Sequence, residues 1–390
     1  MNTIRLFDQD SARKEFQGEV LACEPAEAGY KILLDQTAFF PEGGGQTADT
    51  GTLVVTEADR VFVKDVQEEQ GLIYHYTEQP VEPGTKVTGI LDWEERFSKM
   101  QHHSGEHIVS GLVNKHFGFH NVGFHLGSQV VTLDFDGTLT KEQLRQVERE
   151  ANEAVAANLP ILVTYPAKEE LEKISYRSKI EIEGQVRIVE IPGYDVCACC
   201  APHVAATGQI GMIKLINMHH YKSGVRIYML CGFAALADYC EKEESVQEIA
   251  LSMSTKENQV VQAVERLKEE IYRQKGQIMA LTDALLNYKV AAVPFGTKQA
   301  VFVEAELEGS QPRELVNKLL ERQVKVAVVF AGNEEKGYRY VIGSREEDTR
   351  AIAKEMNGVL HGRGGGKPEM VQGTVACSRE EIAAYFGEIL

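Results

Sequence analysis

The chain has 390 residues, too many for one ordinary hydrophobic core, so two or three domains are expected. Its 41 basic and 58 acidic residues give a net charge of −17, which argues against non-specific nucleic-acid binding through a basic shell but leaves room for a local basic patch. The longest apolar runs fall well short of the ~20 residues that a membrane span needs, and the N-terminus lacks the apolar core of a signal peptide. Seven cysteines, three of them within residues 197–200, indicate thiolate–metal chemistry in a reducing cytoplasm rather than a disulfide framework.

Residues 1–98 are rich in predicted β-strands. Short runs of β-forming residues, such as 18–23, 30–35 and 60–66, are separated by turn formers, which favours a small β-barrel or sandwich. Within this region lies Phe40-Pro41-Glu42-Gly43-Gly44-Gly45-Gln46, with three consecutive glycines. Glycines bring no packing side chain and cost backbone entropy, so we expect a ligand or another backbone to approach closely there. A flexible turn is the alternative.

Residues 99–232 alternate predicted helices and strands as an α+β domain. The first predicted helix begins near Asp92 and reads as amphipathic. It carries His103 and His107, which the i, i+4 spacing places one turn apart on the same face. Two imidazoles at this spacing can bind one Zn²⁺.

A second cluster of potential ligands follows about a hundred residues later. Cys199 and His203 are also separated by three residues, and with the two histidines they complete a His₃Cys set. Thiolate and imidazole are ligands that zinc prefers, so the two pairs predict a zinc site. Cys197 and Cys200 are competing ligands on the sequence alone.

The same helix permits a different metal chemistry. His103-Ser104-Gly105-Glu106-His107 matches the H-x-x-E-H pattern of inverzincin metallopeptidases, in which Glu106 would be the general base. The sequence lacks an obvious downstream helix with an acidic ligand. A peptidase would also leave the Cys199-x-x-x-His203 pair and the glycine-rich stretch unexplained, so it is the second hypothesis.

Residues 233–290 contain few glycines and no proline, and they predict a long helix or a helical hairpin. Residues of one potential seam repeat with the 4-3 spacing of a coiled coil, with a single polar break: Val260, Val264, Leu267, Ile271, Gln274, Ile278, Leu281 and Leu285. Pairing with a second chain and packing within one chain are the two interpretations.

Residues 291–390 alternate strands and helices as a small open α/β domain. Near its end, His361-Gly362-Arg363-Gly364-Gly365-Gly366-Lys367-Pro368 is a second glycine-rich stretch. Exposed glycine amides beside Arg363 and Lys367 suit a phosphate or a nucleic-acid backbone. A flexible, solvated loop is the alternative.

Taken in order, these motifs resemble the editing domain of alanyl-tRNA synthetase and its free-standing relatives, the AlaX trans-editing proteins. The resemblance covers nearly the whole chain. It rests on four segments: Phe40-Pro41-Glu42-Gly43-Gly44-Gly45-Gln46-x-x-Asp49-x-Gly51, Met100-Gln101-x-His103-x-x-x-His107, Cys199-x-x-x-His203-Val204-x-x-Thr207-Gly208-x-Ile210-Gly211 and Gly362-Arg363-Gly364-Gly365-Gly366-Lys367-Pro368. The long AlaX type is the form that the chain resembles most.

The resemblance implies an α+β protein of four parts. These are an N-terminal β-barrel (1–98), a zinc-binding editing domain (99–232), a helical or coiled-coil linker (233–290) and a DHHA1-like domain for tRNA binding and oligomerisation (291–390). No aminoacylation core precedes the barrel, so the resemblance implies editing without synthesis. It further implies a cytoplasmic homodimer with no membrane contact.

The implied reaction is hydrolysis of the ester that joins a wrong amino acid to the 3′ end of tRNA(Ala), with serine first and glycine second. A pocket built for a methyl group rejects competitors of similar or smaller size by only roughly 10–200-fold. A second site that hydrogen-bonds the serine hydroxyl rejects alanine, because alanine would leave buried polar groups unpaired.

The candidate site residues fall into four groups. The Zn²⁺ ligands are His103, His107, Cys199 and His203, and the catalytic candidates are Ser104, Gln46 and Glu106, with Ser104, Gln46 and Thr47 as possible readers of the hydroxyl. The substrate-binding candidates are Gly43, Gly44, Gly45, Thr47 and Asp49, and the tRNA-binding candidates are Arg363, Gly364, Gly365, Gly366 and Lys367.

The chain departs from the family pattern at two places beside the site. Ser104 stands where the family usually has threonine, and Cys199-Cys200-Ala201-Pro202-His203 replaces the usual Cys-Gly-Gly-Thr-His. Both changes bear on substrate choice more than on metal binding. A third hypothesis is a tRNA-binding protein with a structural zinc and no activity, and the net charge of −17 predicts a localised, salt-sensitive tRNA contact.

Overall fold

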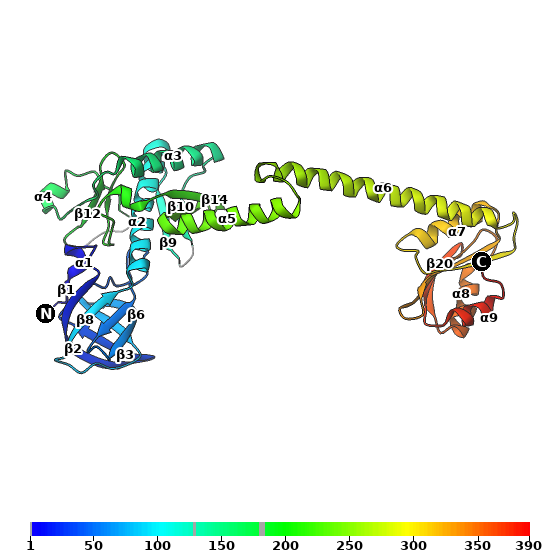
Figure 1. Ribbon diagram of the computed structural model, residues 1–390, viewed down its shortest axis with the longest axis horizontal. Coiled ribbons are helices and arrows are strands. Elements are labelled where there is room, and N and C mark those ends of the chain that lie inside the picture. Colours follow the sequence, from blue (N-terminus) through cyan, green and yellow to red (C-terminus); the bar gives the residue numbers. More distant parts are fainter. Residues whose placement is uncertain (1, 128–129, 179–183) are drawn as a thin grey trace. The chain divides into compact units, whose positions relative to one another are not determined.

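The computed structural model describes residues 2–127, 130–178 and 184–390. The chain divides into two compact units, Met1–Glu248 and Ile249–Leu390 (Figure 1). The predicted fold class is confirmed: a barrel, an α+β layer, a helical segment and a C-terminal α/β layer follow one another. Among the described residues, no helix has both the length and the apolar character needed to cross a membrane.

A closed six-stranded β-barrel opens the first unit, with every neighbouring pair of strands antiparallel. Its strand order is β2 (Glu15–Ala26), β3 (Gly29–Leu34), β7 (Leu72–Thr77), β6 (Arg60–Glu69), β5 (Gly51–Val54) and β8 (Lys86–Leu91). Beside the barrel, β1 (Ile4–Arg5) pairs with β4 (Gln36–Thr37) and leads into the short helix α1 (Leu6–Gln9). The glycine-rich residues 43–45 lie in the connection between β4 and β5.

Helix α2 (Trp93–Phe117) leaves the last barrel strand and forms the centre of the unit. Asp92 caps its N-terminus by accepting a hydrogen bond from the backbone amide of Glu95 at 3.3 Å, and Gly118 ends it with a φ of 71°. Every residue from 99 to 113 is buried. The sequence predicts an amphipathic helix, but barrel, sheets and helix α3 surround it on all sides.

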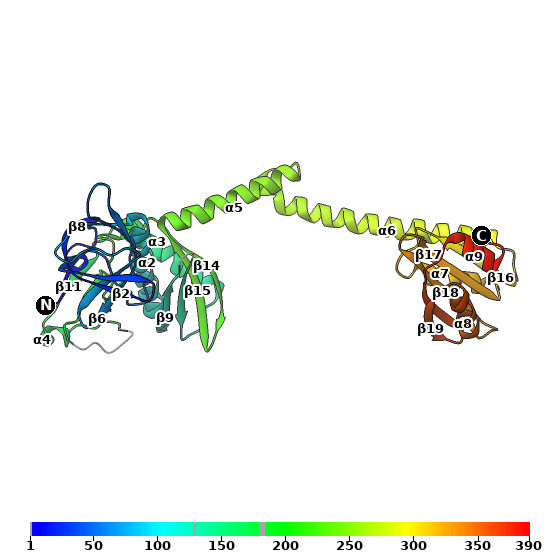
Figure 2. The same cartoon turned by 90° about the horizontal axis from the view of Figure 1, so that it is seen from below.

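An antiparallel sheet and helix α3 (Lys141–Ala157) pack around α2 (Figure 2). The sheet order is β14 (Ile213–Tyr221), β15 (Gly224–Cys231), β10 (Val131–Phe135) and β9 (Asn121–Leu126). Alternate residues of β10, such as Leu133, join side chains of both helices in one core. Helix α3 begins at the predicted Thr140, whose side chain forms a capping box with Gln143.

A smaller three-stranded sheet carries the second ligand segment. Its order is β11 (Leu162–Thr164), β12 (Ile188–Ile191) and β13 (Asp195–Ala198), and α4 (Lys168–Leu171) lies between β11 and β12 in the chain. Cys199 follows β13 directly. The segment then runs to the short 3₁₀ helix η1 (Thr207–Ile210), which contacts both α2 and α3.

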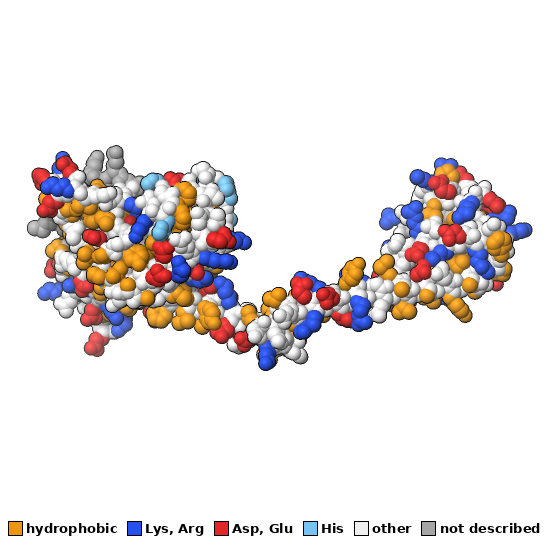
Figure 3. All heavy atoms as spheres, turned by 90° about the horizontal axis from the view of Figure 1, so that it is seen from above, with side chains coloured by type: hydrophobic (Ala, Val, Ile, Leu, Met, Phe, Trp, Pro, Cys, Tyr) orange, Lys and Arg blue, Asp and Glu red, His pale blue; other side chains and the backbone are white. Residues whose placement is uncertain are grey.

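The predicted helical segment consists of two helices, α5 (Gly232–Ser252) and α6 (Val260–Ala292), with the short 3₁₀ helix η2 (Glu257–Gln259) just before α6. On the chain by itself, the apolar seam residues of α6 from Leu267 to Leu285 are exposed. Figure 3 shows hydrophobic side chains at the surface of this helix among charged ones.

The C-terminal unit is a five-stranded mixed sheet with helices on both faces. Its strand order is β16 (Gln299–Glu304), β17 (Val326–Asn333), β18 (Gly337–Ser344), β20 (Met370–Val375) and β19 (Arg363–Lys367). Helix α7 (Gln311–Glu321) and the end of α6 share one core with the sheet, whereas α8 (Thr349–Val359) and α9 (Arg379–Phe386) share the other. The glycine-rich stretch is therefore an edge strand, because β20 holds it through a regular antiparallel ladder.

Candidate metal centre

Helix α2 buries an unusual number of polar side chains. A helix buried on all sides is expected to be apolar, and charged side chains are rarely buried without partners. Here His103, Glu106 and His107 are each no more than 2% exposed, and further polar residues are buried around them: Lys99, Gln101, His102, Ser104 and Ser110. Packing alone does not explain this concentration, so the middle of α2 marks a candidate site.

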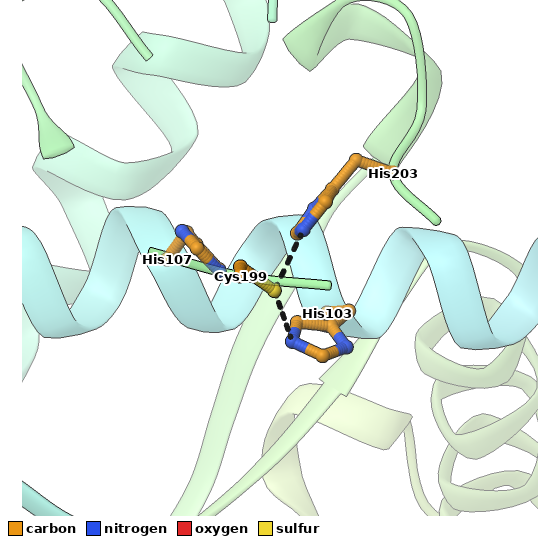
Figure 4. A group of neighbouring side chains, drawn as sticks. All are labelled: His103, His107, Cys199 and His203. Atoms are coloured by element: carbon orange, nitrogen blue, oxygen red, sulfur yellow. Dashed lines mark hydrogen bonds between the residues drawn. The ribbon is translucent and has the colours of Figure 1, made fainter. Parts of the chain in front are cut away.

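The two predicted ligand pairs meet at one point (Figure 4). His103 and His107 extend from successive turns of α2, while Cys199 and His203 come from the segment after β13. One potential ligand atom from each of the four lies within 4.8 Å of the others. Cys199 Sγ lies 3.4 Å from Nε2 of His103 and 3.4 Å from Nε2 of His203.

A polar atom holds the far nitrogen of each histidine ring. Gln46 Oε1 lies 3.0 Å from Nδ1 of His103, and Ser104 Oγ lies 3.0 Å from Nδ1 of His203. Asp195 Oδ2 lies 2.9 Å from Nδ1 of His107. With the proton on Nδ1, each ring turns the lone pair of Nε2 toward the common centre, which is the arrangement of metal-binding histidines.

The charge states of His203 and Cys199 suit a divalent cation. Burial lowers the pKa of His203 to about 3, so this ring is neutral. Burial by itself would raise the pKa of the Cys199 thiol, but His103 and His203 beside it hold that pKa well below its usual range. Metal binding requires a thiolate and neutral imidazoles, so this donor set fits Zn²⁺.

Asp195 contacts the ring of His107 on the side away from the centre, and Arg177 holds Asp195 in turn. The guanidinium donates from Nε at 2.7 Å and from Nη2 at 2.8 Å to the two carboxylate oxygens. Burial opposes protonation of His107, but the hydrogen bond to Asp195 and the nearby Cys199 raise its pKa well above its ordinary value. Cys197 also approaches His107 and Asp195, but the carboxylate is already committed to two partners, which argues against a second metal there.

A cavity of about 650 Å³ opens onto the four-residue centre. Gly44 and Gly45 line one side, with φ angles of 62° and 83° in the left-handed region. A Cβ on Gly45 would lie 2.8 Å from Cδ1 of Phe124, and one on Gly44 would lie 3.3 Å from Sγ of Cys200. The glycines therefore let the backbone close around the cavity, as the sequence predicts for a close approach. Cys200 lies at this wall rather than in the four-residue centre.

Glu106 lies at the boundary between the cavity and the centre. Its Oε1 accepts hydrogen bonds from Ser110 Oγ at 2.7 Å and from Asn121 Nδ2 at 2.6 Å. Its Oε2 lies 3.8 Å from Nε2 of His107. A buried carboxylate with this orientation is a candidate general base or acid.

Five other predicted site residues have different surroundings. Ser104 and Gln46 contact histidine rings and do not occur among the described residues that line the cavity. Thr47 lines a separate hollow beside Lys99. Asp49 forms a buried ion pair with Arg96 of α2 and accepts a hydrogen bond from the Phe40 amide at 2.7 Å. Gly43 lies next to the cavity wall but is not part of it.

Sequence reasoning missed Asp195, Arg177 and Asn121. No local pattern marks them, because each acts on a residue that is distant in the chain or on another element. The only available signal is the acidic Asp195 two positions before Cys197, where a supporting carboxylate for a ligand would be expected.

The second glycine-rich stretch presents an exposed edge. All residues of β19, from Arg363 to Lys367, are exposed. Gly364 packs closely, since a Cβ there would lie 2.3 Å from the Tyr340 hydroxyl, whereas Gly365 faces open space. The strand thus places Arg363 and Lys367 at its two ends.

Three family models match successive parts of the chain. They describe class II (A) tRNA synthetases over residues 8–95, the second additional domain of threonyl and alanyl tRNA synthetases over 186–247, and the DHHA1 domain over 286–386. The second match contains Cys199 and His203. The chain thus consists of tRNA synthetase-related domains.

Relatives that match nearly the whole of this chain narrow the class of synthetase. The alanine–tRNA ligase of Ignicoccus hospitalis is 29% identical over 97% of this chain, and that of Pyrococcus furiosus is 31% identical over 96%. In both, the match covers 42% of the relative, so this chain spans less than half their length. A solved C-Ala domain of Aquifex aeolicus alanyl-tRNA synthetase has 23% identity and a TM-score of 0.20, covering 22% of this chain and 86% of that one. The chain is an AlaX-like protein related to alanyl-tRNA synthetases.

Proposed function

We propose that this chain is a zinc-dependent trans-editing hydrolase. It removes serine from mischarged Ser-tRNA(Ala), and glycine from Gly-tRNA(Ala) as a second substrate. The observation that carries the proposal is the position of the His₃Cys centre and Glu106 together at one wall of a cavity that two glycines border.

Zinc would be held by His103, His107, Cys199 and His203. When bound, it supplies a Lewis acid that polarises an ester carbonyl or lowers the pKa of a coordinated water. Gln46, Ser104 and Asp195 keep the three rings oriented, which makes them positioning residues. Ser104 Oγ and Gln46 Oε1 are engaged at the rings. The buried Nε2 of Gln46 has no hydrogen-bond partner among the described residues and stays a candidate reader of the serine hydroxyl.

Glu106 performs the proton transfers in this proposal. Ser110 and Asn121 fix one carboxylate oxygen, and the other faces His107 Nε2 across 3.8 Å. From there the carboxylate takes a proton from the attacking water and returns it to the 3′ oxygen of the leaving tRNA. Gly44 and Gly45 accommodate the terminal ribose, since they present no side chain to the cavity.

The C-terminal unit is proposed to hold the body of the tRNA. Of the 41 basic and 58 acidic residues of the chain, 19 and 20 respectively fall in Ile249–Leu390. The negative charge is therefore concentrated in the first unit, and the C-terminal unit is nearly neutral. Arg363, Gly364, Gly365, Gly366 and Lys367 on the exposed edge strand are its candidate phosphate contacts.

The proposal is tested by release of labelled serine from Ser-tRNA(Ala), with Ala-tRNA(Ala) alongside. Wild type should release serine much faster than alanine. Glu106→Gln should lower kcat by about 10²–10⁴-fold while keeping its zinc, since it removes only the proton acceptor. Glu190→Gln, a carboxylate on β12 outside the cavity, is the matched control, and His107→Ala should lose both zinc and activity.

Two other outcomes identify the rival functions. A zinc-loaded, folded protein that leaves the ester intact but cleaves peptides would be a metallopeptidase built on His103, Glu106 and His107. A protein that shifts tRNA in a gel and hydrolyses neither substrate would be a binding protein with a structural zinc. Either result would refute the deacylase proposal.

A further inference from the structure

Arg187, at the start of β12, connects the cavity wall to the metal centre. Its side chain is only 10% exposed and lines the cavity. Nη1 donates to the backbone oxygen of Cys199 at 2.8 Å and to that of Ala201 at 3.0 Å. These bonds fix the guanidinium plane against the segment that carries two of the four centre residues.

The opposite edge of this guanidinium has no hydrogen-bond partner among the described residues. Nε is buried without a partner, and Nη2 makes no hydrogen bond. Two other arginines of the same unit use this same edge. Arg177 donates from Nε and Nη2 to Asp195, and Arg226 does so to Asp134 at 2.6 and 2.7 Å. Of these three arginines, Arg187 is therefore the one whose guanidinium fork, the edge formed by Nε and Nη2, is held in place without a hydrogen-bond partner among the described residues.

The nearest carboxylate does not fill the fork. Asp8 Oδ1 lies 4.0 Å from Nε of Arg187, beyond hydrogen-bonding distance. Asp8 Oδ2 instead forms an ion pair with Nε of Arg5 at 2.8 Å, and Arg5 also donates to Glu68. Arg5 is thus neutralised by its own neighbours, while the buried charge of Arg187 faces the cavity.

A buried guanidinium fork is complementary to an oxyanion with two adjacent oxygens. We propose that the Nε and Nη2 edge of Arg187 binds the phosphodiester that precedes the terminal nucleoside of the substrate. The Cys199 backbone that Arg187 holds belongs to a residue of the metal centre, and both residues line the same cavity. A terminal nucleoside carries a 5′ phosphate and, on the same ribose, the 3′ oxygen of the aminoacyl ester, so one nucleoside in this cavity would present both groups.

The inference rests on the proposed function for the identity of the substrate, but it can be measured without catalysis. The ligands are the dinucleotide CpA, which contains one phosphodiester, adenosine, which contains none, and inorganic phosphate. Calorimetric titration of the zinc-loaded full chain should show CpA binding about tenfold more tightly than adenosine, as expected for a charge-assisted bidentate contact.

Arg187→Lys keeps the positive charge but not the fork, so the preference for CpA should fall to about twofold or less. Arg226→Lys, whose fork is filled by Asp134, is the matched control and should keep the preference. Asp8→Asn removes the closest competing charge and should strengthen CpA binding several-fold. This second variant leaves the contacts of Arg187 to the ligand segment in place, so it tests the proposal even if Arg187→Lys loses zinc.

Equal binding of CpA and adenosine by wild type would overturn the proposal, as would a CpA preference that survives Arg187→Lys. Inorganic phosphate that binds as tightly as CpA would show a free-phosphate site and overturn the assignment to a nucleic-acid end. In the serine-release assay, Arg187→Lys should raise KM about tenfold. A wild type that binds CpA selectively but releases no serine would refute the editing function and leave the phosphodiester site standing.

Discussion

The three histidine rings of the centre owe their orientation to single contacts. His107 is the clearest example, because its Nδ1 lies 2.9 Å, at ion-pair distance, from a carboxylate oxygen of Asp195, which a bidentate arginine holds in turn. Such a carboxylate–histidine pair raises the basicity of the ligand nitrogen and fixes its tautomer. The affinity for metal should therefore depend on residues that never contact the metal.

Asp195→Asn should weaken zinc binding by about 10–100-fold. The substitution keeps the shape but removes the charge that orients His107, and it leaves Arg177 without its carboxylate. Competition with a chromophoric chelator measures the effect. Asp134→Asn is the control, because Asp134 forms the same bidentate pair with Arg226 away from the centre. Equal zinc affinities in the two variants would contradict the role assigned to Asp195.

A buried histidine of the barrel, His75, makes the stability of the barrel depend on pH. His75 is fully buried, its Nδ1 lies 3.1 Å from the Ile32 backbone oxygen, and its Nε2 lies 2.8 Å from Thr37 Oγ1. Burial lowers its pKa from 6.5 to about 4, so the folded state disfavours the proton. The stability that His75 contributes is complete above pH 6.5 and is lost as the pH falls toward 4, by about 3 kcal/mol.

The measurement is the melting temperature between pH 7.5 and 4.5. Wild type should lose stability below pH 6.5 more steeply than His75→Gln, which cannot gain that proton. His220→Gln, at an exposed position of β14, is the control and should follow wild type. Parallel curves for wild type and His75→Gln would show that His75 does not contribute to the acid response.

At the level of elements, α2 holds the glycine-rich segment along one face. Arg96 pairs with Asp49, Lys99 Nζ donates to the backbone oxygen of Ala48, and His103 meets Gln46. These α2 residues are spaced by three or four positions, so they form a single stripe. On its other side the segment contacts β9, where the Leu126 amide donates to the Gly45 oxygen at 3.2 Å.

Gly45→Ala should displace this segment and lower serine release by at least about tenfold. Alanine at position 45 would have to adopt a positive φ. Its Cβ would also meet both the ring and the backbone oxygen of Phe124, the latter at 2.9 Å. Gly84→Ala separates the effect of the positive φ from that of the steric clash, because Gly84 has a φ of 84° but a Cβ there would meet nothing within 4 Å.

Both variants should lose about 1 kcal/mol to the unfavourable φ, and the added clash should cost Gly45→Ala a further 1–3 kcal/mol or so. Thermal melting and serine release report the two effects. Equal stability and activity in both variants would show that the segment adjusts freely.

For the whole molecule, the exposed seam of α6 bears on assembly. Leu267, Ile271, Ile278, Leu281 and Leu285 are each at least 45% exposed on the single chain. Heptad spacing is the pattern by which two helices bury such a stripe, with Gln274 as the one polar position. We propose a homodimer paired along this seam, as the family resemblance implies.

Ile271→Asp combined with Ile278→Asp should convert the dimer to monomers, because two buried charges would face each other across the seam. Sedimentation velocity gives the oligomeric state. Tyr272→Asp with Met279→Asp adds the same charges at exposed positions one residue off the seam, and this variant should remain dimeric. Monomeric wild type, or dimers in both variants, would exclude pairing along this seam.

The sequence by itself determined the domain order, the barrel, the start of α3 at Thr140 and the two ligand pairs. These features depend on local patterns: strand alternation, a capping box and spacings of one helical turn. It also indicated Glu106 as a candidate general base, because that residue shares a turn of the helix with His103 and His107.

Only the tertiary structure decided what surrounds these residues. Gln46 and His103 are 57 positions apart, and Ser104 and His203 are 99 apart, so no local pattern indicates that they meet. The burial of α2 on all sides and the β19 edge strand in place of a loop also depend on neighbours from other elements. The free fork of Arg187 became visible only beside the filled forks of Arg177 and Arg226, because hydrogen-bond occupancy is a property of packed side chains rather than of sequence.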